Sequence, residues 1–549
     1  MAPLEIPASN STVRLRAIDA KTQMSVSSKG FIQPILPGFE ILNLTSITFL
    51  IEHPTLDKKV LFDCGARKDL ENFSPRIKER LNLNVKGLKI EKDVHEIVQE
   101  AGIDLEDLDA TIWSHWHWDH HGAPEKYSSK TGIVVGPGFK KNFMPGYPTV
   151  PDAIFLDANF ATRSIREIDF STNFKIGNFR AHDYFGDGSF YLLDTPGHAI
   201  GHMCGLARTT PTTFVFLGGD ICHFGGSFRP SSTIQLPDPV PNSHLDKHLP
   251  HPCPCSLFTD VHPAGASSTD SRTTPFFEVT SFAQSAYLDR EQAAASIKEL
   301  QHFDEHPDVL VCIAHDPTLI KVLPFLNDQP EKYLNDWQKE GLKEKAQWGW
   351  LNELPRGGRP GREQYVEASV VPRTWLTYNL FAMEQLQEIF QPHQFRADEH
   401  HIDLYHVYDN LSRTPYQPGI GIECEDPDEY FMNAWHVITP SAMMKHLNWR
   451  NRTRTQFISL YGNFADASRE QQRRRNQPYG RRIPGSVRIV HVRLLRNTNV
   501  WAFSRAEMLS MMGTFSQEAR LQTLKTSASS EWFVWGVIPD DFVQNGHLL

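Results

Sequence analysis

The most informative stretch of the chain is Ser114-His-Trp-His-Trp-Asp-His-His-Gly122, which places four candidate metal ligands within six residues. It begins where Ala110-Thr-Ile-Trp-Ser114, an apolar and β-branched run that predicts a buried strand, comes to its end. Residues two apart in an extended segment face the same side, so His115 and His117 can offer their imidazoles to one metal ion. Asp119 and His120 follow after the chain begins to turn, and we expect them to reach a second ion nearby.

Three further candidate ligands lie downstream, each near the end of a predicted strand. They are His198 in Asp194-Thr-Pro-Gly-His198, Asp220 in Gly218-Gly-Asp220 and His315 in Ile313-Ala-His315. The strands are predicted over 189–193, 213–217 and 309–314, where apolar residues run together. With a bridging oxygen added, seven such groups suit two Zn²⁺ ions of about four or five ligands each. The sequence therefore predicts two zinc ions per chain.

This order of residues resembles the signature of the metallo-β-lactamase superfamily, in which His-x-His-x-Asp-His is followed downstream by His, Asp and His. The resemblance covers about residues 12–351 and includes Leu61-Phe-Asp-Cys-Gly65, which is similar to an early Asp-Gly turn of the family. It implies an α/β fold, an αββα sandwich of two mixed sheets flanked by helices. It also implies that Asp63 supports the metal loop, with a plain turn-forming aspartate as the alternative.

The resemblance also distributes the ligands between the two ions. It assigns one metal to His115, His117 and His198, the other to Asp119, His120 and His315, and the bridge between them to Asp220. Relatives with a di-iron redox site typically carry a carboxylate where His117 stands. A redox reaction is therefore not favoured.

The predicted pair of zinc ions indicates that the protein catalyses a hydrolysis reaction. Two such ions lower the pKa of a shared water toward about 7, so the nucleophile is a metal-bound hydroxide and not a side chain. One ion polarises the carbonyl of an ester, lactone or amide while the other stabilises the leaving oxygen. We expect Asp119 to carry a proton to the leaving group. The predicted protein is a dinuclear zinc hydrolase that acts on a small molecule.

The stretch Asp194-Thr-Pro-Gly-His-Ala-Ile-Gly-His-Met203 is most similar to the lactonase-type branch, and there His202 would support the ligands. Many lactonases carry a Tyr three residues after the bridging Asp, where this chain has His223. His223 is therefore a candidate catalytic residue that donates a hydrogen bond to an oxyanion or acts as a general acid. A packed loop histidine is the alternative. Val135-Gly-Pro-Gly-Phe139 looks like part of a largely uncharacterised fungal group in this superfamily.

Length and breaker residues predict two globular units. The chain has 549 residues, 40% of them hydrophobic, which is too long for one ordinary domain. Pro355-Arg-Gly-Gly-Arg-Pro-Gly361 predicts a linker over 355–364 between a hydrolase domain, 1–354, and an α+β C-terminal domain of unknown function, 365–549. Nine prolines from Pro230 to Pro275 predict a long loop over 228–276, either a lid or binding wall or a surface excursion.

The net charge of the chain limits the kinds of macromolecule that it can bind. A formal net charge of −10 opposes nucleic-acid binding over the whole surface. Nine arginines between Arg469 and Arg496 leave a local contact with RNA, DNA or an acidic partner open, and with it a metal-dependent phosphodiesterase or nuclease. A solvated helix face is the commoner reason for such a segment. A non-catalytic binding protein with a structural metal is a third reading, which seven ligands oppose because a structural zinc needs four.

The remaining features predict a cytoplasmic protein. No secretory signal is evident at the start, and no apolar run approaches the ~20 residues of a membrane span. Seven scattered cysteines fit a reducing compartment. We expect Arg67 and Lys68 to be ordinary surface charges, with contact to an anionic substrate as the alternative. The sequence gives no indication of the oligomeric state.

Overall fold

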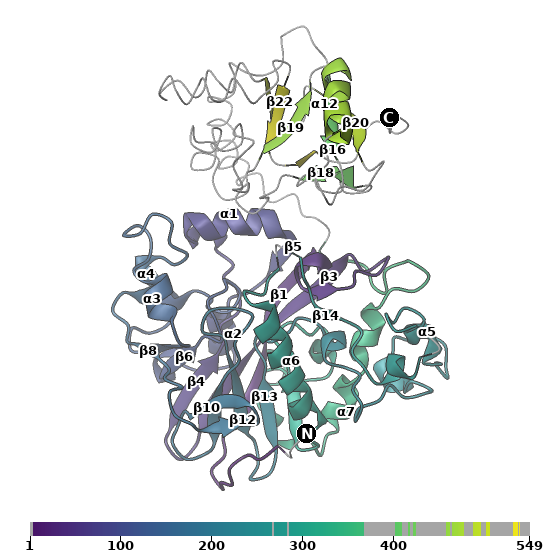
Figure 1. Cartoon of the computed structure of the whole chain (residues 1–549). Helices are drawn as coiled ribbons and strands as arrows, with labels where there is room; N and C mark the ends of the chain where they lie inside the picture. The colour runs from purple at the N-terminus through teal and green to yellow at the C-terminus, as the bar shows by residue number, and fades with distance from the viewer. Residues whose placement is uncertain are drawn as a thin grey trace. The chain divides into compact units, whose positions relative to one another are not determined.

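The structure is a computed structural model that describes residues 4–265, 268–282 and 285–366 together with nine shorter segments. Those segments are 401–408, 416–417, 421–423, 457–461, 464–476, 487–495, 501–504, 531–535 and 537–538. The chain divides into two compact units, residues 1–369 and 370–549 (Figure 1).

Two sheets form the centre of the first unit. The first sheet has seven strands in the order β5-β1-β3-β4-β6-β7-β8, and the second has six in the order β15-β13-β12-β11-β10-β9. The strands of the first sheet are β1 (Arg14–Ser27), β3 (Ile41–His53), β4 (Lys58–Phe62), β5 (Val85–Ile90), β6 (Ala110–Ile112), β7 (Gly132–Val135) and β8 (Ile165–Glu167). Those of the second are β9 (Lys175–Ile176), β10 (Phe179–Asp183), β11 (Phe190–Asp194), β12 (Met203–Arg208), β13 (Phe214–Leu217) and β15 (Val309–Cys312). The short strands β2 (Ile32–Gln33) and β14 (Glu278–Val279) pair separately.

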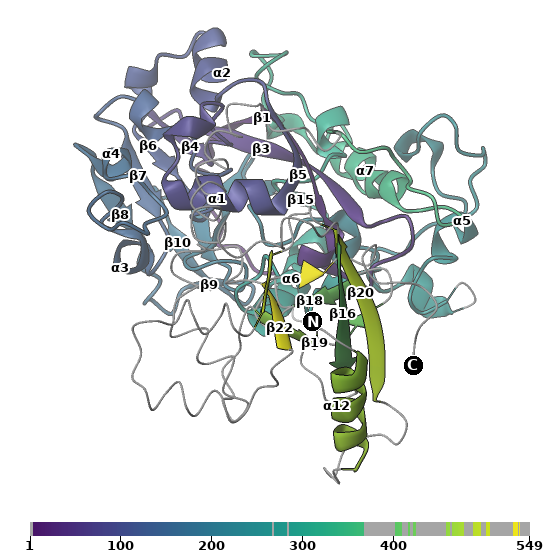
Figure 2. The same cartoon turned by 90° about the horizontal axis from the view of Figure 1, so that it is seen from above.

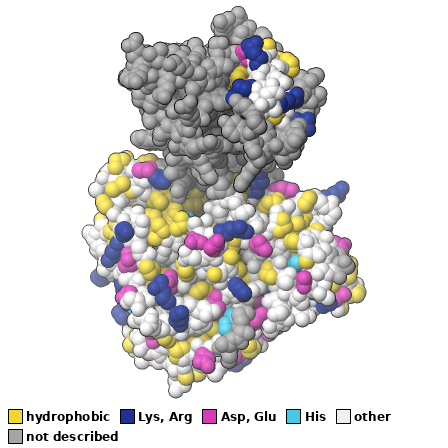
Figure 3. Space-filling model, viewed as in Figure 1, with side chains coloured by type: hydrophobic (Ala, Val, Ile, Leu, Met, Phe, Trp, Pro, Cys, Tyr) yellow, Lys and Arg dark blue, Asp and Glu magenta, His cyan; other side chains and the backbone are white. Residues whose placement is uncertain are grey.

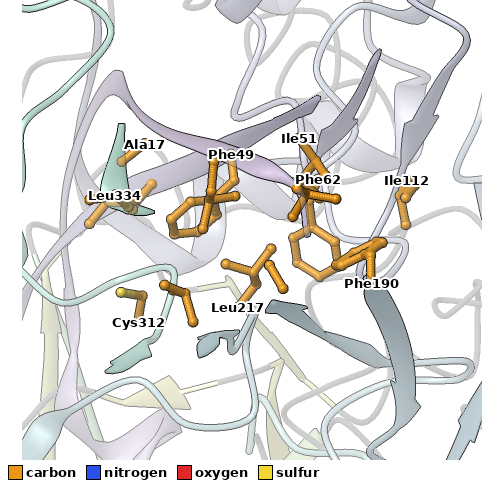
Figure 4. Close-up of a cluster of buried hydrophobic side chains, with 14 of the residues drawn as sticks. Ala17, Phe49, Ile51, Phe62, Ile112, Phe190, Leu217, Cys312 and Leu334 are labelled. Atoms are coloured by element: carbon orange, nitrogen blue, oxygen red, sulfur yellow. The ribbon is translucent and has the colours of Figure 1, made fainter. Parts of the chain in front are cut away.

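The core between the two sheets follows from the alternation of side chains along each strand. In β13, Val215 and Leu217 join the cluster between the sheets, whereas Phe216 points to the other face. Phe49 and Phe62 meet this inner cluster from the first sheet (Figure 4). A sheet that is apolar on both faces needs a further layer outside it, so each of the two sheets requires helices on its outer face.

Helices α2 and α6 supply those outer layers. The helices of the first unit are α1 (Pro75–Asn84), α2 (Val94–Glu100), α3 (Phe139–Phe143), α4 (Asp157–Phe160), α5 (Ser256–Thr259), α6 (Arg290–Glu305) and α7 (Leu342–Ala346). Val94, Ile97 and Val98 of α2 pack on the first sheet, and Leu300 and Phe303 of α6 pack on the second. Figure 2 shows α2 and α6 on opposite sides of the paired sheets. The predicted αββα sandwich is confirmed.

The segment 228–276 packs a hydrophobic cluster of its own. Leu236 and Phe258 are fully buried and join Trp350 in a cluster beside β1 and β3. At the start of the segment, Arg229 forms a two-pronged ion pair with Asp304 of α6, with N to O distances of 2.6 and 2.8 Å, and both side chains are buried. The segment is therefore a packed part of the first unit and not a surface excursion.

The segment 355–364, which we expected to be a linker, contacts the first unit. The Arg362 guanidinium lies 2.7 Å from a carboxylate oxygen of Asp246 and 3.0 Å from one of Glu353. The side-chain amide of Asn43, in β3, donates to the carbonyl of Glu363 at 2.9 Å. A run of Pro and Gly predicts only that regular structure stops, so these long-range contacts are not visible in the local sequence.

The described part of the second unit combines antiparallel sheets with one helix. The larger sheet has the order β20-β16-β19-β22-β21, and β17, β18 and β23 form a smaller one. The elements are β16 (His401–Tyr408), β17 (Tyr416–Gln417), β18 (Gly421–Glu423), β19 (Phe457–Tyr461), α12 (Phe464–Asn476), β20 (Arg488–Leu495), β21 (Trp501–Ser504), β22 (Glu531–Trp535) and β23 (Val537–Ile538). Ala467 of α12 packs with Val407 and Ile489. This arrangement agrees with the α+β expectation.

The arginine-rich segment 469–496 begins on α12, and its residues 477–486 and 496 lie outside the described residues. Arg473 and Arg474 both donate to the carboxylate of Glu470, at 2.6 and 2.7 Å. On the face of the first unit in Figure 3, Lys and Arg side chains are interspersed with Asp and Glu. Contact with nucleic acid stays a prediction.

Over the described residues, no helix combines the length and the apolar character needed to cross a membrane.

Candidate metal centre

The candidate ligands gather at one edge of the sandwich because of strand direction. β4 runs parallel to β6, and β13 runs parallel to β15, so the carboxyl ends of each pair lie together. His115, Asp220 and His315 each come three residues after the end of β6, β13 and β15, respectively. The two sheets are joined here by the main chain, since the N–H of Met203 donates to the carbonyl of Ser114 at 2.8 Å.

The first ligand group consists of His115, His117 and His198, whose ring nitrogens surround one point. His115 Nε2 lies 2.8 Å from His117 Nδ1 and 3.1 Å from His198 Nε2, and the last two nitrogens are 2.9 Å apart. His115 and His198 are buried, whereas His117 is partly exposed. The group therefore meets solvent at His117.

This geometry fits a divalent cation better than a hydrogen-bonded cluster. A neutral imidazole has one N–H, so three ring nitrogens that all face one another cannot satisfy each other by hydrogen bonds. Tetrahedral coordination with Zn–N bonds of about 2.05 Å places ligand nitrogens about 3.3 Å apart, close to the separations found. The donor set of the first group therefore fits zinc.

The second ligand group consists of Asp119, His120 and His315, and all three side chains are buried. His120 Nε2 and His315 Nε2 each lie 3.0 Å from Asp220 Oδ1. Asp119 Oδ2 is 3.5 Å from His315 Nε2 and 3.9 Å from His120 Nε2. Two imidazoles and a carboxylate again match the ligands that zinc accepts.

Asp220 lies between the two groups and divides its oxygens between them. Oδ1 faces the second group, and Oδ2 lies 3.3 Å from His198 Nε2 and 3.5 Å from His115 Nε2 in the first. Burial alone would raise the pKa of Asp220, but the surrounding imidazoles, led by His120 and His315, hold that pKa well below its usual range. The carboxylate reaches both groups at once, with one oxygen toward each.

Asp63 braces the metal loop from behind. The backbone N–H and the hydroxyl of Ser114 donate to Asp63 Oδ1 and Oδ2 at 2.7 and 2.9 Å. His120 Nδ1 lies 2.9 Å from Asp63 Oδ2. Because an ionised carboxylate only accepts, His120 carries its proton on Nδ1 and turns the lone pair of Nε2 toward the second group. Asp63 is thus more than a turn residue in this structure.

Two more ligands are oriented in the same way. His315 Nδ1 donates to the backbone carbonyl of Thr45, which leaves the lone pair of Nε2 toward Asp220. His115 Nδ1 lies 3.0 Å from the Ser114 hydroxyl oxygen, whose own proton goes to Asp63. Each contact fixes a tautomer in which the inward nitrogen is free to bind a cation.

His202 supports Asp220 and belongs to neither ligand group. Its Nε2 accepts from the backbone N–H of Asp220 at 3.0 Å, and its Nδ1 lies 3.0 Å from the carbonyl of Thr195. Burial lowers the pKa of His202 to about 3, so the ring is neutral and can accept. Gly219 makes this close approach possible, since a Cβ there would lie 3.1 Å from His202 Nε2 and 2.9 Å from the Ser114 side chain. The role expected for His202 agrees with these contacts.

His223 lies against the same bridging carboxylate. Its Nε2 is 3.1 Å from Asp220 Oδ2, and its Nδ1 is 3.0 Å from the Tyr287 hydroxyl. Its side chain is buried, and a ring nitrogen lies close enough to a carboxylate oxygen of Asp220 and a ring nitrogen of His315 to form a third candidate ligand group. The ring is therefore in contact with the centre.

The aromatic residues of the motif line the loop. Trp113 is buried and stacks on Phe155 with 5.6 Å between ring centroids. His121 is buried beside Trp113 and Phe155, away from both ligand groups. The Trp116 ring lies 4.3 Å from that of His117, and both side chains are partly exposed.

Arg67 differs from the surface charge that we expected. Its side chain is 1% exposed and pairs with Asp69 at 2.7 Å and with Glu125 at 2.5 Å, next to the Phe73 ring. The two carboxylates stabilise the buried guanidinium, which the sequence alone does not reveal. Lys68 is exposed and pairs with Glu96.

The structure brings all seven predicted ligands together, and His223 with them. Tyr287 was missed because it stands 64 residues after His223 and in no motif. Thr45 was missed because its contribution is a backbone carbonyl, which carries no residue-type signal.

Two families match the sequence. The metallo-beta-lactamase superfamily matches residues 45–215, and a domain of unknown function (DUF7587) matches residues 401–545. The second match coincides with the second compact unit, so the C-terminal domain is separate from the hydrolase fold.

Curated relatives cover most of the first unit. "Gamma-lactamase FDB1" of Fusarium pseudograminearum is 39% identical over 361 residues, which are 64% of this chain and 85% of that protein. "Gamma-lactamase MBL2" of Gibberella moniliformis is 43% identical over 249 residues, 44% of this chain and all of that protein. The chain belongs to the metallo-beta-lactamase superfamily, whose members bind divalent metals and include metal-dependent hydrolases.

Among solved structures, the chain is similar to that of an AiiA mutant from B. thuringiensis with N-decanoyl-L-homoserine bound at its active site. It is 18% identical, covers 59% of this chain and 99% of its own, and has a TM-score of 0.39.

Proposed function

We propose that the protein is a dinuclear zinc hydrolase that opens a small cyclic carbonyl compound, either a γ-lactam or a lactone. One observation carries the proposal: Asp220 directs one carboxylate oxygen to each of two ligand groups. Such a division suits a carboxylate that is shared by two cations. His115, His117 and His198 would hold one zinc ion, and Asp119, His120 and His315 the other.

Two bound zinc ions would supply Lewis acidity and a water that loses its proton near neutral pH. The protein's own residues then have to orient the substrate and move protons. Asp119 is a buried carboxylate beside His315, placed to accept a proton and return it to the leaving atom. His223 is a second proton-bearing group at the same centre, on the other oxygen of Asp220.

The substrate class rests on chemistry and on the relatives. A lactam nitrogen leaves only when it is protonated, whereas a lactone or aryl ester oxygen leaves with less help. Two acid–base groups beside the ligands therefore suit an amide bond. The names of the two curated relatives support a γ-lactam, and the Thr195 to His202 pattern, with its lactonase-type spacing, supports a lactone.

The test combines metal content with turnover in one preparation. The full chain is purified without chelators, its zinc is measured by elemental analysis, and it is assayed with γ-lactams, γ-lactones, aryl esters and bis-aryl phosphodiesters. Asp220→Asn is measured beside His182→Gln, which changes a histidine that bonds Arg166 in β8 and lies outside all three ligand groups. We expect about two zinc ions per chain and carbonyl turnover that falls about a thousandfold in Asp220→Asn.

Each alternative has its own outcome. A preference for the phosphodiester would favour the nuclease reading. If the chain binds zinc but turns over none of the substrates, and if Asp220→Asn leaves the zinc content unchanged, a binding protein would be favoured. The proposal fails if the chain binds no metal and stays inactive after zinc is added.

A further inference from the structure

We infer that Tyr287 is a positioning residue whose hydroxyl holds His223 as the Nε2–H tautomer, directed at the bridging carboxylate of Asp220. The catalytic consequence rests on the proposed function, while the tautomer itself does not. Tyr287 belongs to neither ligand group, and its residue type and position in the sequence give no hint of this contact.

The hydroxyl of Tyr287 lies at the end of a chain of three polar groups. Tyr287 Oη is 3.0 Å from His223 Nδ1, and His223 Nε2 is 3.1 Å from Asp220 Oδ2. All three side chains are 5% exposed or less. A buried polar group keeps its partner because water does not compete for it, so this chain of contacts persists in the folded protein.

The direction of each hydrogen bond follows from Asp220. An ionised carboxylate has no proton to give, so His223 Nε2 must donate to it. A neutral imidazole has one N–H, and Nδ1 is then a lone pair that needs a donor. The hydroxyl of Tyr287 is that donor. Without it, His223 could exchange to the Nδ1–H tautomer, whose Nε2 lone pair would face the carboxylate or bind a metal.

Packing holds the His223 ring in this orientation. Phe31 lies against it at 4.5 Å, and the His315 ring stacks on it at 5.5 Å with 13° between planes. The ring of Tyr287 meets His223 edge-on at 88° and His198 at 83°. A ring enclosed by three neighbours turns with difficulty, so the hydroxyl contact selects a tautomer and not merely a rotamer.

Tyr287 is itself fixed by the backbone around His198. The N–H of Leu288 donates to the carbonyl of His198 at 3.0 Å, and the N–H of Asp289 donates to that of Gly197 at 2.9 Å. The Asp289 side chain then caps α6. Gly197 has a φ of 129°, and a Cβ there would lie 2.2 Å from the backbone nitrogen of Ala293. The segment that carries Tyr287 is thus tied to a ligand loop.

The inference predicts a loss that depends on the leaving group. If His223 donates its Nε2 proton during bond cleavage, loss of the correct tautomer affects a lactam, whose nitrogen needs the proton, more than an aryl ester, whose phenolate does not. We expect Tyr287→Phe to lower kcat for a γ-lactam by about tenfold to a hundredfold, with a smaller change for an aryl ester.

The experiment uses the zinc-loaded full chain as wild type, Tyr287→Phe, His223→Gln and the double variant. Tyr184→Phe serves as the control, because it removes the hydroxyl of a partly buried tyrosine that packs beside Arg166 and the cluster between the sheets. Zinc content and kcat for both substrates are measured. Proton–nitrogen correlation spectra of ¹⁵N-histidine protein report the His223 tautomer, with the signal assigned by His223→Gln.

The expected result is a wild-type His223 in the Nε2–H form that shifts toward Nδ1–H in Tyr287→Phe at unchanged zinc content. Tyr287→Phe should also cause no further loss in the His223→Gln background. An unchanged tautomer, an additive loss in the double variant or a metal-bound Nε2 would overturn the inference. If no substrate is turned over, the proposed function fails, and the spectra still decide the role of Tyr287.

Discussion

The two ligand groups are built from similar residues but are supported differently. In the second group, His120 is held by the Asp63 carboxylate and His315 by the Thr45 carbonyl, and all of its ligands are buried. In the first group, His117 is partly exposed, and His198 Nδ1 has no hydrogen-bond partner among the described residues. Groups that orient a ligand from behind strengthen metal binding. The second group should therefore hold its metal more tightly than the first.

Of the tests that compare the two groups, we expect the largest effect from substituting one histidine ligand in each group. His120→Gln removes a buried ligand and leaves Asp63 without that partner, whereas His117→Gln removes a partly exposed ligand. We expect His120→Gln to lower kcat/KM at least about a hundredfold and to lose one zinc ion, with a smaller loss for His117→Gln. Steady-state kinetics and zinc content measure both. Equal losses would remove the distinction between the groups.

Asp63→Asn tests the support that Asp63 gives to the metal loop without replacing a ligand. The amide keeps the size of the side chain but offers Ser114 and His120 fewer acceptor sites. Competition with a chelator measures the zinc affinity of each of the two sites. We expect the affinity of the tighter site to fall about tenfold to a hundredfold. Asp69→Asn, which alters the Arg67 ion pair instead, is the control. A loss at the weaker site alone would contradict the assignment.

Removal of metal by a chelator should proceed in two phases. The first group meets solvent at His117, so its ion is the more accessible one. We expect one zinc ion to leave several-fold faster than the other, with further acceleration of the fast phase in His117→Gln. A chromogenic chelator follows the release. A single phase that accounts for both ions would mean that the groups do not differ.

The smallest effect is expected for His202→Phe, which leaves the backbone N–H of Asp220 buried without its acceptor. An unsatisfied buried donor lowers the free energy of unfolding by about 1–3 kcal/mol. Denaturant unfolding of the zinc-loaded protein measures it, with His182→Gln for comparison. An unchanged unfolding midpoint would show that His202 does not support Asp220.

Local sequence patterns were enough to predict strands and the candidate ligands that follow them. Apolar runs predicted β13 and β15, and the residues just beyond them, Asp220 and His315, reach the centre because parallel strands end at one edge. Apolar runs therefore predicted the strands that carry these ligands, whereas the sandwich itself was implied by the resemblance to the metallo-β-lactamase superfamily.

The features that the sequence did not predict are long-range contacts. Arg67 is buried because Glu125, 58 residues away, pairs with it, and Arg362 is tied to Asp246, 116 residues away. Tyr287 reaches His223 through a segment with no pattern of its own. Periodicity describes which face of an element is apolar, but it does not say which distant side chain fills a given position.

The most direct test of the account is a crystal structure of the chelator-free protein with anomalous scattering recorded at the zinc edge. The account predicts two zinc peaks, one among His115, His117 and His198 and one among Asp119, His120 and His315. Each should lie about 2.0–2.2 Å from a different oxygen of Asp220. A single peak, or two peaks of which neither contacts Asp220, would contradict it.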